Sequence, residues 1–244
     1  MSHEFYIGYE DNPPPHLSRF LGRVVLGLAV LLVVIAGAVA ATQSPAEPGN
    51  YEFGVEKSFE GLLVEGALPL LQVGMSPGAI TNYLLVGAGK FGLPAFARGH
   101  GGERVQFRGS LIQKGTAVMI EMNNPSSFAV VKTPSNEMAS GHAIGQVSLI
   151  GELVDTKCYF GVMRPGAGKV HRGCAVRCLH GGVPPGLLLR DSAGNQLVVM
   201  LTGTGTSKLD VDPEWAARFI RAEGRMLMRG NVPVVEVRVL ELAE

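Results

Sequence analysis

All three cysteines of the chain lie in one short segment that also carries a histidine: Cys158, His171, Cys174 and Cys178. Residues 169–179 have the composition of a short helix, ended by Gly-Gly and Pro-Pro pairs. On that helix His171, Cys174 and Cys178 would share one face. Cys158 could approach them from a preceding strand. The segment therefore predicts a cluster of three sulfurs and one imidazole.

Three kinds of chemistry are open to such a cluster. Three thiolates and one imidazole make a tetrahedral zinc set, and the same soft ligands suit copper. A disulfide between Cys158 and either Cys174 or Cys178 would instead fasten the segment to the rest of the fold. A thiol-disulfide pair formed by Cys174 and Cys178 is less favoured, because three residues separate them instead of the usual two. The odd number of cysteines leaves one thiol over in any disulfide scheme.

The same segment is rich in positive charge: Lys157, Arg164, Lys169, Arg172 and Arg177. Cations beside a thiol lower its pKa, and they could also dock an acidic partner or an anionic cofactor. The simplest interpretation is a solvated basic rim.

Other chemistries lack their sequence motifs. The chain contains no C-x-x-C-H haem site, no Rieske boxes and no G-x-S-x-G nucleophile elbow. We therefore expect no catalytic residues, and an enzyme is the less favoured class. The 21 basic residues balance the 21 acidic ones, which argues against a nucleic-acid partner.

One hydrophobic segment near the N-terminus has the length and composition of a transmembrane helix. We predict the helix at residues 17–41, of which residues 24–41 carry no charge. Arg19 and Arg23 stand at its start, and the next basic residue is Lys57. The positive-inside rule then places the N-terminus in the cytoplasm and the larger part of the chain outside it.

A cleaved signal peptide is the alternative, since Ala-Val-Ala at residues 38–40 resembles a cleavage site. The preceding segment is long and contains acidic residues, which favours an uncleaved anchor. We expect a cytoplasmic tail at residues 1–16 and a Pro/Gly/Ser-rich linker at residues 42–50. The protein would be a single-pass component of the bacterial inner membrane. Its thiols would face the oxidising side, where a disulfide is favoured over a metal site.

Beyond the linker the chain is expected to be mainly β. The halves 51–135 and 142–244 show a similar succession of strand-like segments, which predicts two tandem OB-like β-barrels. The cysteine segment would be an insertion of the second barrel at residues 155–186. A helix at residues 212–224 would precede the last hairpin of that barrel. A single β-sandwich is the alternative.

The cysteine segment reads GELVDTKCYFGVMRPGAGKVHRGCAVRCLHGGVPP. It resembles a segment of an uncharacterised family of membrane-anchored bacterial proteins that has no assigned activity. The resemblance implies that the segment is a defined unit, and it transfers no catalytic residue.

The sequence supports two hypotheses for the function. The first is an accessory subunit of a bacterial membrane complex, in a respiratory or electron-transfer assembly, whose partners are other membrane-protein subunits. The alternative is a periplasmic protein that binds copper or zinc, or cycles a disulfide, through Cys158, His171, Cys174 and Cys178.

Overall fold

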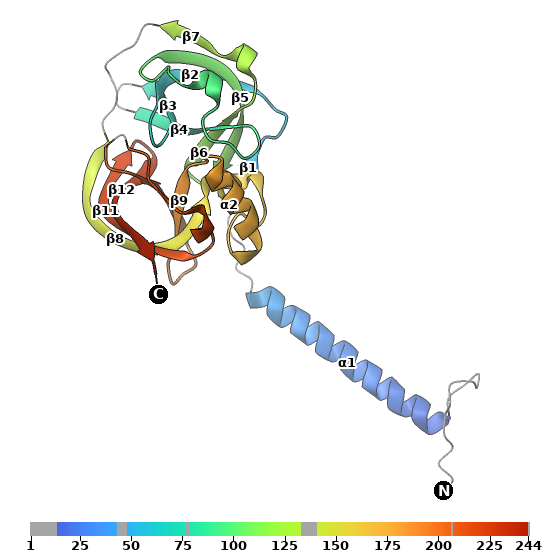
Figure 1. Ribbon diagram of the computed structural model, residues 1–244. Helices are drawn as coiled ribbons and strands as arrows, with labels where there is room; N and C mark the ends of the chain where they lie inside the picture. Colours follow the sequence, from blue (N-terminus) through green and yellow to red (C-terminus); the bar gives the residue numbers. More distant parts are fainter. Residues whose placement is uncertain (1–13, 43–47, 77–78, 133–140, 206, 244) are drawn as a thin grey trace. The chain divides into compact units, whose positions relative to one another are not determined.

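The computed structural model describes residues 14–42, 48–76, 79–132, 141–205 and 207–243. Residues 1–46 and 47–244 form two compact units. The first contains the helix α1, and the second is mainly β (Figure 1). The predicted cytoplasmic tail and linker lie largely outside the described residues.

Helix α1 spans Pro15–Thr42. Its most apolar stretch has a mean hydropathy of 3.0, and none of that stretch is buried by the rest of the protein. An isolated helix in water would not expose so many Leu and Val side chains, because each exposed apolar side chain is unfavourable. The helix is therefore long and apolar enough to cross a membrane, or to serve as a signal sequence.

Five strands close the first barrel: β2 (Lys57–Val64), β3 (Leu70–Ser76), β4 (Ala79–Gly87), β5 (Arg104–Lys114) and β6 (Ala117–Met122). Around the ring β2 pairs with β3, β3 with β4, β4 with β6, β6 with β5, and β5 with β2. Only the β4–β6 pair is parallel. Two short strands, β1 (Asn50–Tyr51) and β7 (Ala129–Lys132), each pair antiparallel with β5.

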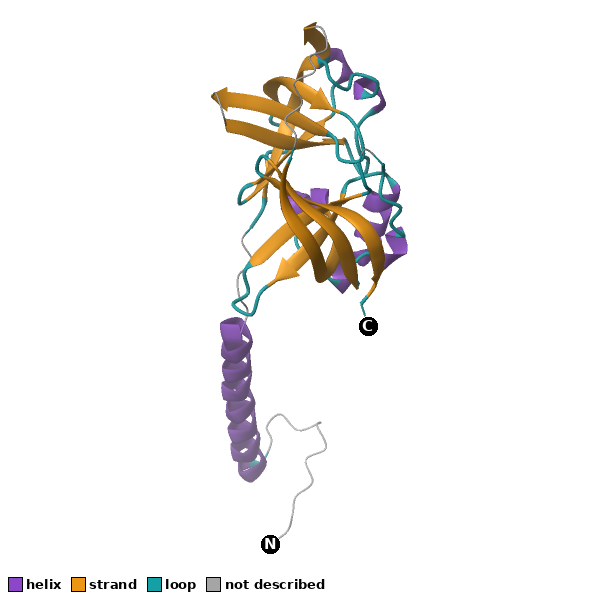
Figure 2. Ribbon diagram, turned by 90° about the vertical axis from the view of Figure 1, so that its left-hand side faces the viewer, coloured by secondary structure: helices purple, strands orange, loops and turns teal. Residues whose placement is uncertain are grey.

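The second barrel repeats this order: β8 (His142–Asp155), β9 (Pro185–Arg190), β10 (Gln196–Thr202), β11 (Phe219–Arg229) and β12 (Val232–Leu242). The parallel pair is again that of the third and fifth strands, β10 and β12. Figure 2 shows the strands of both barrels in orange. The predicted pair of β-barrels is confirmed, and each barrel has five strands.

The helix predicted at residues 212–224 is wrong. A single 3-10 turn, η5 (Pro213–Trp215), occupies its start, and β11 begins soon after it. Asp212 does cap the turn, since its Oδ1 accepts a hydrogen bond of 2.9 Å from the Glu214 amide. The chain then becomes extended, and Ile220 and Ala222 both point into the barrel with no exposed surface. That alternation has the period of a strand.

The equivalent connection in the first barrel runs through the Gly-rich residues 87–102. It contains only a 3-10 turn, η1 (Ala95–Ala97). A second turn, η2 (Pro125–Ser127), precedes β7.

The two barrels share a hydrophobic core. Residues of both barrels belong to one buried cluster, which includes Leu70, Leu84, Ile112 and Met119 of the first and Val154, Leu188, Met200 and Val234 of the second. Cys158 and Cys178 are part of this cluster. Hydrogen bonds add to the apolar contact: the Asn82 amide donates to Asn231 Oδ1 over 2.8 Å, and Asn82 Nδ2 donates to the Arg229 carbonyl over 2.7 Å.

Candidate metal centre

The cysteine segment lies between the end of β8 at Asp155 and the start of β9 at Pro185. It opens with one π-helical turn, η3 (Cys158–Val162), and continues through a 3-10 turn, η4 (Lys169–His171), into helix α2 (Arg172–His180). The helix ends at Gly181, and Gly182 has the positive φ of 86° that lets the chain reverse. The predicted helical segment is thus confirmed, with a tighter first turn.

The insertion brings the three sulfur atoms together. Cys158 Sγ lies 3.8 Å from Cys174 Sγ and 3.9 Å from Cys178 Sγ. All three residues are free thiols in the structure, because a disulfide requires about 2.05 Å between sulfurs. Cys158 and Cys178 are buried, and Cys174 is partly exposed. A small reagent or ion would therefore meet Cys174 first.

The spacing of the sulfurs matches that of metal ligands. Thiolates bound tetrahedrally to zinc at about 2.3 Å lie about 3.8 Å from one another. The separations of Cys158 Sγ from the other two sulfurs agree with that value. Two of the three sulfur pairs therefore have the separation of metal ligands in the thiol form.

His171 joins the cluster and is held by a carboxylate. One of its ring nitrogens lies within 4.8 Å of the sulfurs of both Cys158 and Cys174. Its Nε2 is 3.0 Å from Oδ2 of Asp155, whose other oxygen accepts a hydrogen bond of 2.9 Å from the Cys158 amide. Both side chains are almost completely buried. A buried carboxylate that orients a histidine is a common support of metal sites.

Cys158 lies within reach of the other three predicted residues, which divide between two groups: His171 and Cys174 belong to one, and Cys178 belongs to the other. A second group of possible ligands consists of Asp155, Cys158 and Cys178. Asp155 was not among the predicted ligands. His180 ends α2 as an exposed residue, and it is in neither of the groups formed by the described residues.

The first barrel contributes a cation to the cluster. Lys90 Nζ donates a hydrogen bond of 2.7 Å to Cys174 Sγ and lies 3.8 Å from Cys178 Sγ. The hydrogen bond with Cys174 raises the pKa of Lys90, so the side chain stays an ammonium. The site is thus built from both barrels, which the sequence did not indicate.

Glycines allow the two chain segments to come this close. The Gly92 amide donates a hydrogen bond of 2.9 Å to the Gly181 carbonyl. A Cβ atom at Gly181 would lie 1.7 Å from the carbonyl oxygen of Lys90, and one at Gly92 would lie 2.1 Å from that of Gly182. Real Cβ atoms do not approach oxygen so closely, so both positions require glycine for the Lys90 loop to reach the cysteines.

A buried lysine fixes the same loop from the other side. Lys157 is 1% exposed, and its Nζ donates hydrogen bonds of 2.7 Å to the carbonyls of both Gly87 and Gly89. Its third partner is Glu121 Oε2, at 2.5 Å. Tyr51 donates to the other oxygen of Glu121 over 2.7 Å, and burial together with this bond raises the pKa of Tyr51. Lys157 is therefore part of the support of the site and not of a solvated rim.

The thiols differ in acidity. The hydrogen bond between Cys158 and Cys178 raises the pKa of Cys158 far above that of an ordinary thiol, and burial and the charge of Asp155 act in the same direction. The same hydrogen bond lowers the pKa of Cys178. Cys158 therefore keeps its proton in the metal-free protein, while Cys178 ionises more readily.

Known proteins give no further guidance. Comparisons with models of protein families, with curated proteins and with solved structures find no match to this chain. The assignment of this site accordingly rests on its geometry. That geometry is a cluster of cysteine and histidine side chains that could hold a metal ion.

Proposed function

We propose that the protein binds a single zinc or copper(I) ion through Cys158, His171, Cys174 and Cys178. The observation that carries the proposal is the pair of sulfur separations, 3.8 and 3.9 Å. Sulfur ligands with one imidazole select these two ions among the common biological metals. Zinc would take all four ligands, whereas copper(I) can be held by the three sulfurs.

The charges around the cluster support this function. Three thiolates around a divalent ion leave one negative charge, which Lys90 is placed to neutralise. A hydrogen bond to a bound thiolate also makes the sulfur less reactive toward oxidants, because it withdraws electron density from the lone pairs. We assign Lys90 the role of a supporting residue that stabilises the loaded site without binding the ion itself.

The setting we propose is extracytoplasmic. Helix α1 would act as an uncleaved anchor, with Arg19 and Arg23 on the cytoplasmic side. The two barrels would be OB-like, since their strands follow the order one, two, three, five, four with a parallel third–fifth pair. A membrane-impermeant maleimide tests the topology: in intact cells stripped of their outer membrane it should label Cys174 once a chelator has removed the bound metal. Labelling only after lysis would place the barrels in the cytoplasm.

Metal content decides the main proposal. The full chain is purified in mild detergent under anaerobic conditions, and metal and free thiols are measured together. We expect about one metal ion per chain and no accessible thiol in the loaded protein. His171→Ala should lower the metal content, and the matched variant His180→Ala should not, because His180 lies outside the cluster.

A different result would assign the cysteines another role. A protein that contains one disulfide, one free thiol and no metal, even when purified without oxygen, contradicts the metal site. The cysteines would then form a covalent clamp between the insertion and the barrel.

A second function, as an accessory subunit of a bacterial respiratory or electron-transfer complex, is favoured by a separate observation. Two large apolar side chains are exposed on the segments that carry the site: Phe91 is 65% exposed and Val170 is 84% exposed. They directly follow Lys90 and precede His171 in the chain. A partner subunit in the same membrane would cover them.

Native electrophoresis of mildly solubilised membranes tests this second function. The wild-type chain should migrate in a larger complex, and a Phe91→Ser/Val170→Ser double variant should be released from it while it keeps its metal. A wild-type chain that migrates alone contradicts the subunit proposal and leaves the metal proposal unaffected.

A further inference from the structure

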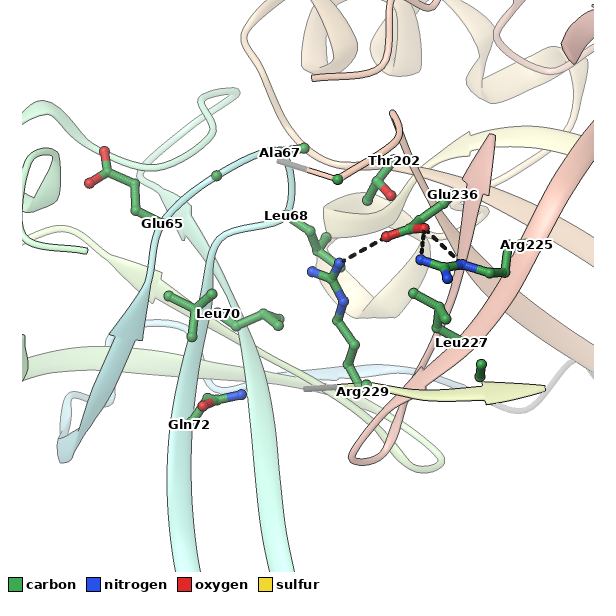
Figure 3. A pocket seen from close by; sticks show the side chains of 15 residues that line it. Glu65, Ala67, Leu68, Leu70, Gln72, Thr202, Arg225, Leu227, Arg229 and Glu236 are labelled. Carbon is green, nitrogen blue, oxygen red and sulfur yellow. Dashed lines mark hydrogen bonds and ion pairs between the residues drawn. The ribbon is translucent and has the colours of Figure 1, made fainter. Parts of the chain in front are cut away.

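A pocket lies in the groove between the two barrels, away from the cysteine cluster. Its volume is about 390 Å³, which falls in the range of small-molecule sites. The first barrel supplies the end of β2, the following turn and β3. The second supplies parts of β11 and β12 and the end of β10 (Figure 3).

The second barrel lines this pocket with charge. Arg225, Leu227 and Arg229 alternate along β11, so their side chains lie on one face of the strand. Glu236 stands directly opposite Arg225 on β12. Arg225 binds one oxygen of Glu236 through two nitrogens, at 2.7 and 3.2 Å.

Arg229 is held much less firmly. Its Nη2 lies 3.6 Å from the other oxygen of Glu236, which is too long for a hydrogen bond. Its guanidinium makes no hydrogen bond to the residues that the structure describes, although the side chain is only 22% exposed. Five N–H donors in a partly buried place are thus available to a ligand.

The end of the pocket formed by Arg225, Arg229 and Glu236 carries one positive charge in excess. Two arginines face the single carboxylate of Glu236. The other acidic residue of the lining, Glu65, points away from them in Figure 3, and its carboxylate accepts a hydrogen bond of 2.8 Å from the Gly99 amide. An anion would therefore be attracted, and a cation would be repelled.

The remaining walls favour an organic anion over an inorganic one. Leu68, Leu70 and Leu227 form an apolar surface next to the guanidinium of Arg229. Thr202 adds a buried hydroxyl that has no hydrogen-bond partner among the described residues. An apolar surface beside a free guanidinium suits a molecule with a carboxylate at one end and a small apolar body at the other.

We propose that this inter-barrel pocket binds a small organic carboxylate, with the carboxylate on Arg229 and the apolar body against Leu68 and Leu227. The planar fork of arginine matches the two oxygens of a carboxylate, which gives a paired, charge-assisted interaction. Glu236 competes with the ligand for Arg229 and so limits the affinity. This site is independent of the metal proposal, because none of its residues belongs to the cysteine cluster.

Three molecules of one shape test the proposal. Benzoate, benzamide and benzamidine are titrated by calorimetry into the full chain in detergent, with empty micelles as the reference. We expect benzoate to bind most tightly, benzamide weakly and benzamidine not at all. The result should be the same before and after treatment with a metal chelator.

Variants of β11 and β12 then locate the binding. Arg229→Met should weaken benzoate binding by about tenfold or more, since a charge-assisted hydrogen bond is lost. Arg221→Met is the matched control on the same strand: its side chain pairs with Glu241 outside the pocket, and binding should not change.

Glu236→Gln provides a test of opposite sign. It removes the competing carboxylate, so benzoate should bind about threefold more tightly or better. A merely structural role of these residues would not produce tighter binding. The proposal is overturned if benzoate binds no better than benzamide, or if neither Arg229→Met nor Glu236→Gln changes its affinity in the stated direction.

Discussion

Replacement of Lys90 by methionine tests the idea that the first barrel stabilises a metal ion held by the second. The substitution keeps the length of the side chain and removes its charge and its donor. In the structure that donor lies 2.7 Å from Cys174 Sγ and 3.8 Å from Cys178 Sγ. No other contact of the cluster is changed, because the backbone of Lys90 is held separately by the glycine contacts.

The size of the effect follows from the geometry. A hydrogen bond to a charged group contributes about 1.5–3 kcal/mol. Lys90 is partly exposed, and solvent screening places the effect toward the lower end of that range. Because about 1.4 kcal/mol corresponds to one factor of ten, Lys90→Met should weaken zinc binding by about ten- to thirtyfold.

The assay is a competition titration of the reduced full chain against a chromophoric zinc chelator at pH 7. Lys169→Met is the control, because it removes an exposed positive charge from the insertion next to His171 without touching the sulfurs, and it should change the affinity by less than about threefold. Equal affinities of the wild type and Lys90→Met would refute the reasoning. Equal losses in the two variants would show that only the general positive charge matters.

Three further predictions concern the support of the site. Gly181→Ala should destabilise the protein by about 1–3 kcal/mol in denaturant titrations, because its Cβ would meet a carbonyl oxygen of the first barrel at 1.7 Å. The control is Gly173→Ala in helix α2: its Cβ would have no atom within 4 Å, and the variant should be more stable by up to about 1 kcal/mol. Lys157→Met should cost about 3–5 kcal/mol in the same assay, since it leaves a buried carboxylate without its cation, and a loss below about 1 kcal/mol would contradict the pairing. The raised pKa of Cys158 means that metal binding near neutral pH must displace its proton, so the affinity should fall by about tenfold per pH unit on acidification for each proton released. Calorimetry in buffers of different ionisation enthalpy counts those protons, and an affinity that is the same at two pH values would contradict this account.

Most of the fold could be predicted from the hydrophobic pattern of the sequence and from the residues that mark turns. The long uncharged apolar run predicted α1, and the repeated succession of short β segments predicted two β-barrels. The helix predicted at residues 212–224 failed because Asp212 and Pro213 begin a 3-10 turn as readily as an α-helix. The inward positions of Ile220 and Ala222 in β11 then decided the conformation of the rest.

The candidate site was predictable only where its residues are close in the chain. His171, Cys174 and Cys178 follow helical spacing, and Cys158 lies at the entry of the same insertion. Lys90 is 84 residues away from the cysteine it contacts, and no local pattern marks such a pairing. Its position depends on backbone contacts between two glycine turns, whose meeting follows from the packing of the barrels.

Lys157 shows a second limit to what the sequence alone can predict. Within a run of basic residues it resembled a solvated cation, since lysine is rarely buried unless it is paired. Its partners, Glu121 and two carbonyls of residues 87–89, come from another barrel. Burial of a charge is decided by such distant partners and is not encoded in the neighbouring residues.

The position of β12 has a consequence for biosynthesis. This strand, Val232–Leu242, closes the second barrel by pairing with both β10 and β11, and it follows all three cysteines in the chain. The first barrel can be complete while the second is still open, because domains fold as they emerge during synthesis. The three thiols are therefore synthesised well before the framework that holds them 3.8–3.9 Å apart. During that interval oxidation would compete with the proposed metal capture for the same sulfurs, and the order of events in the maturing chain would determine which product is formed.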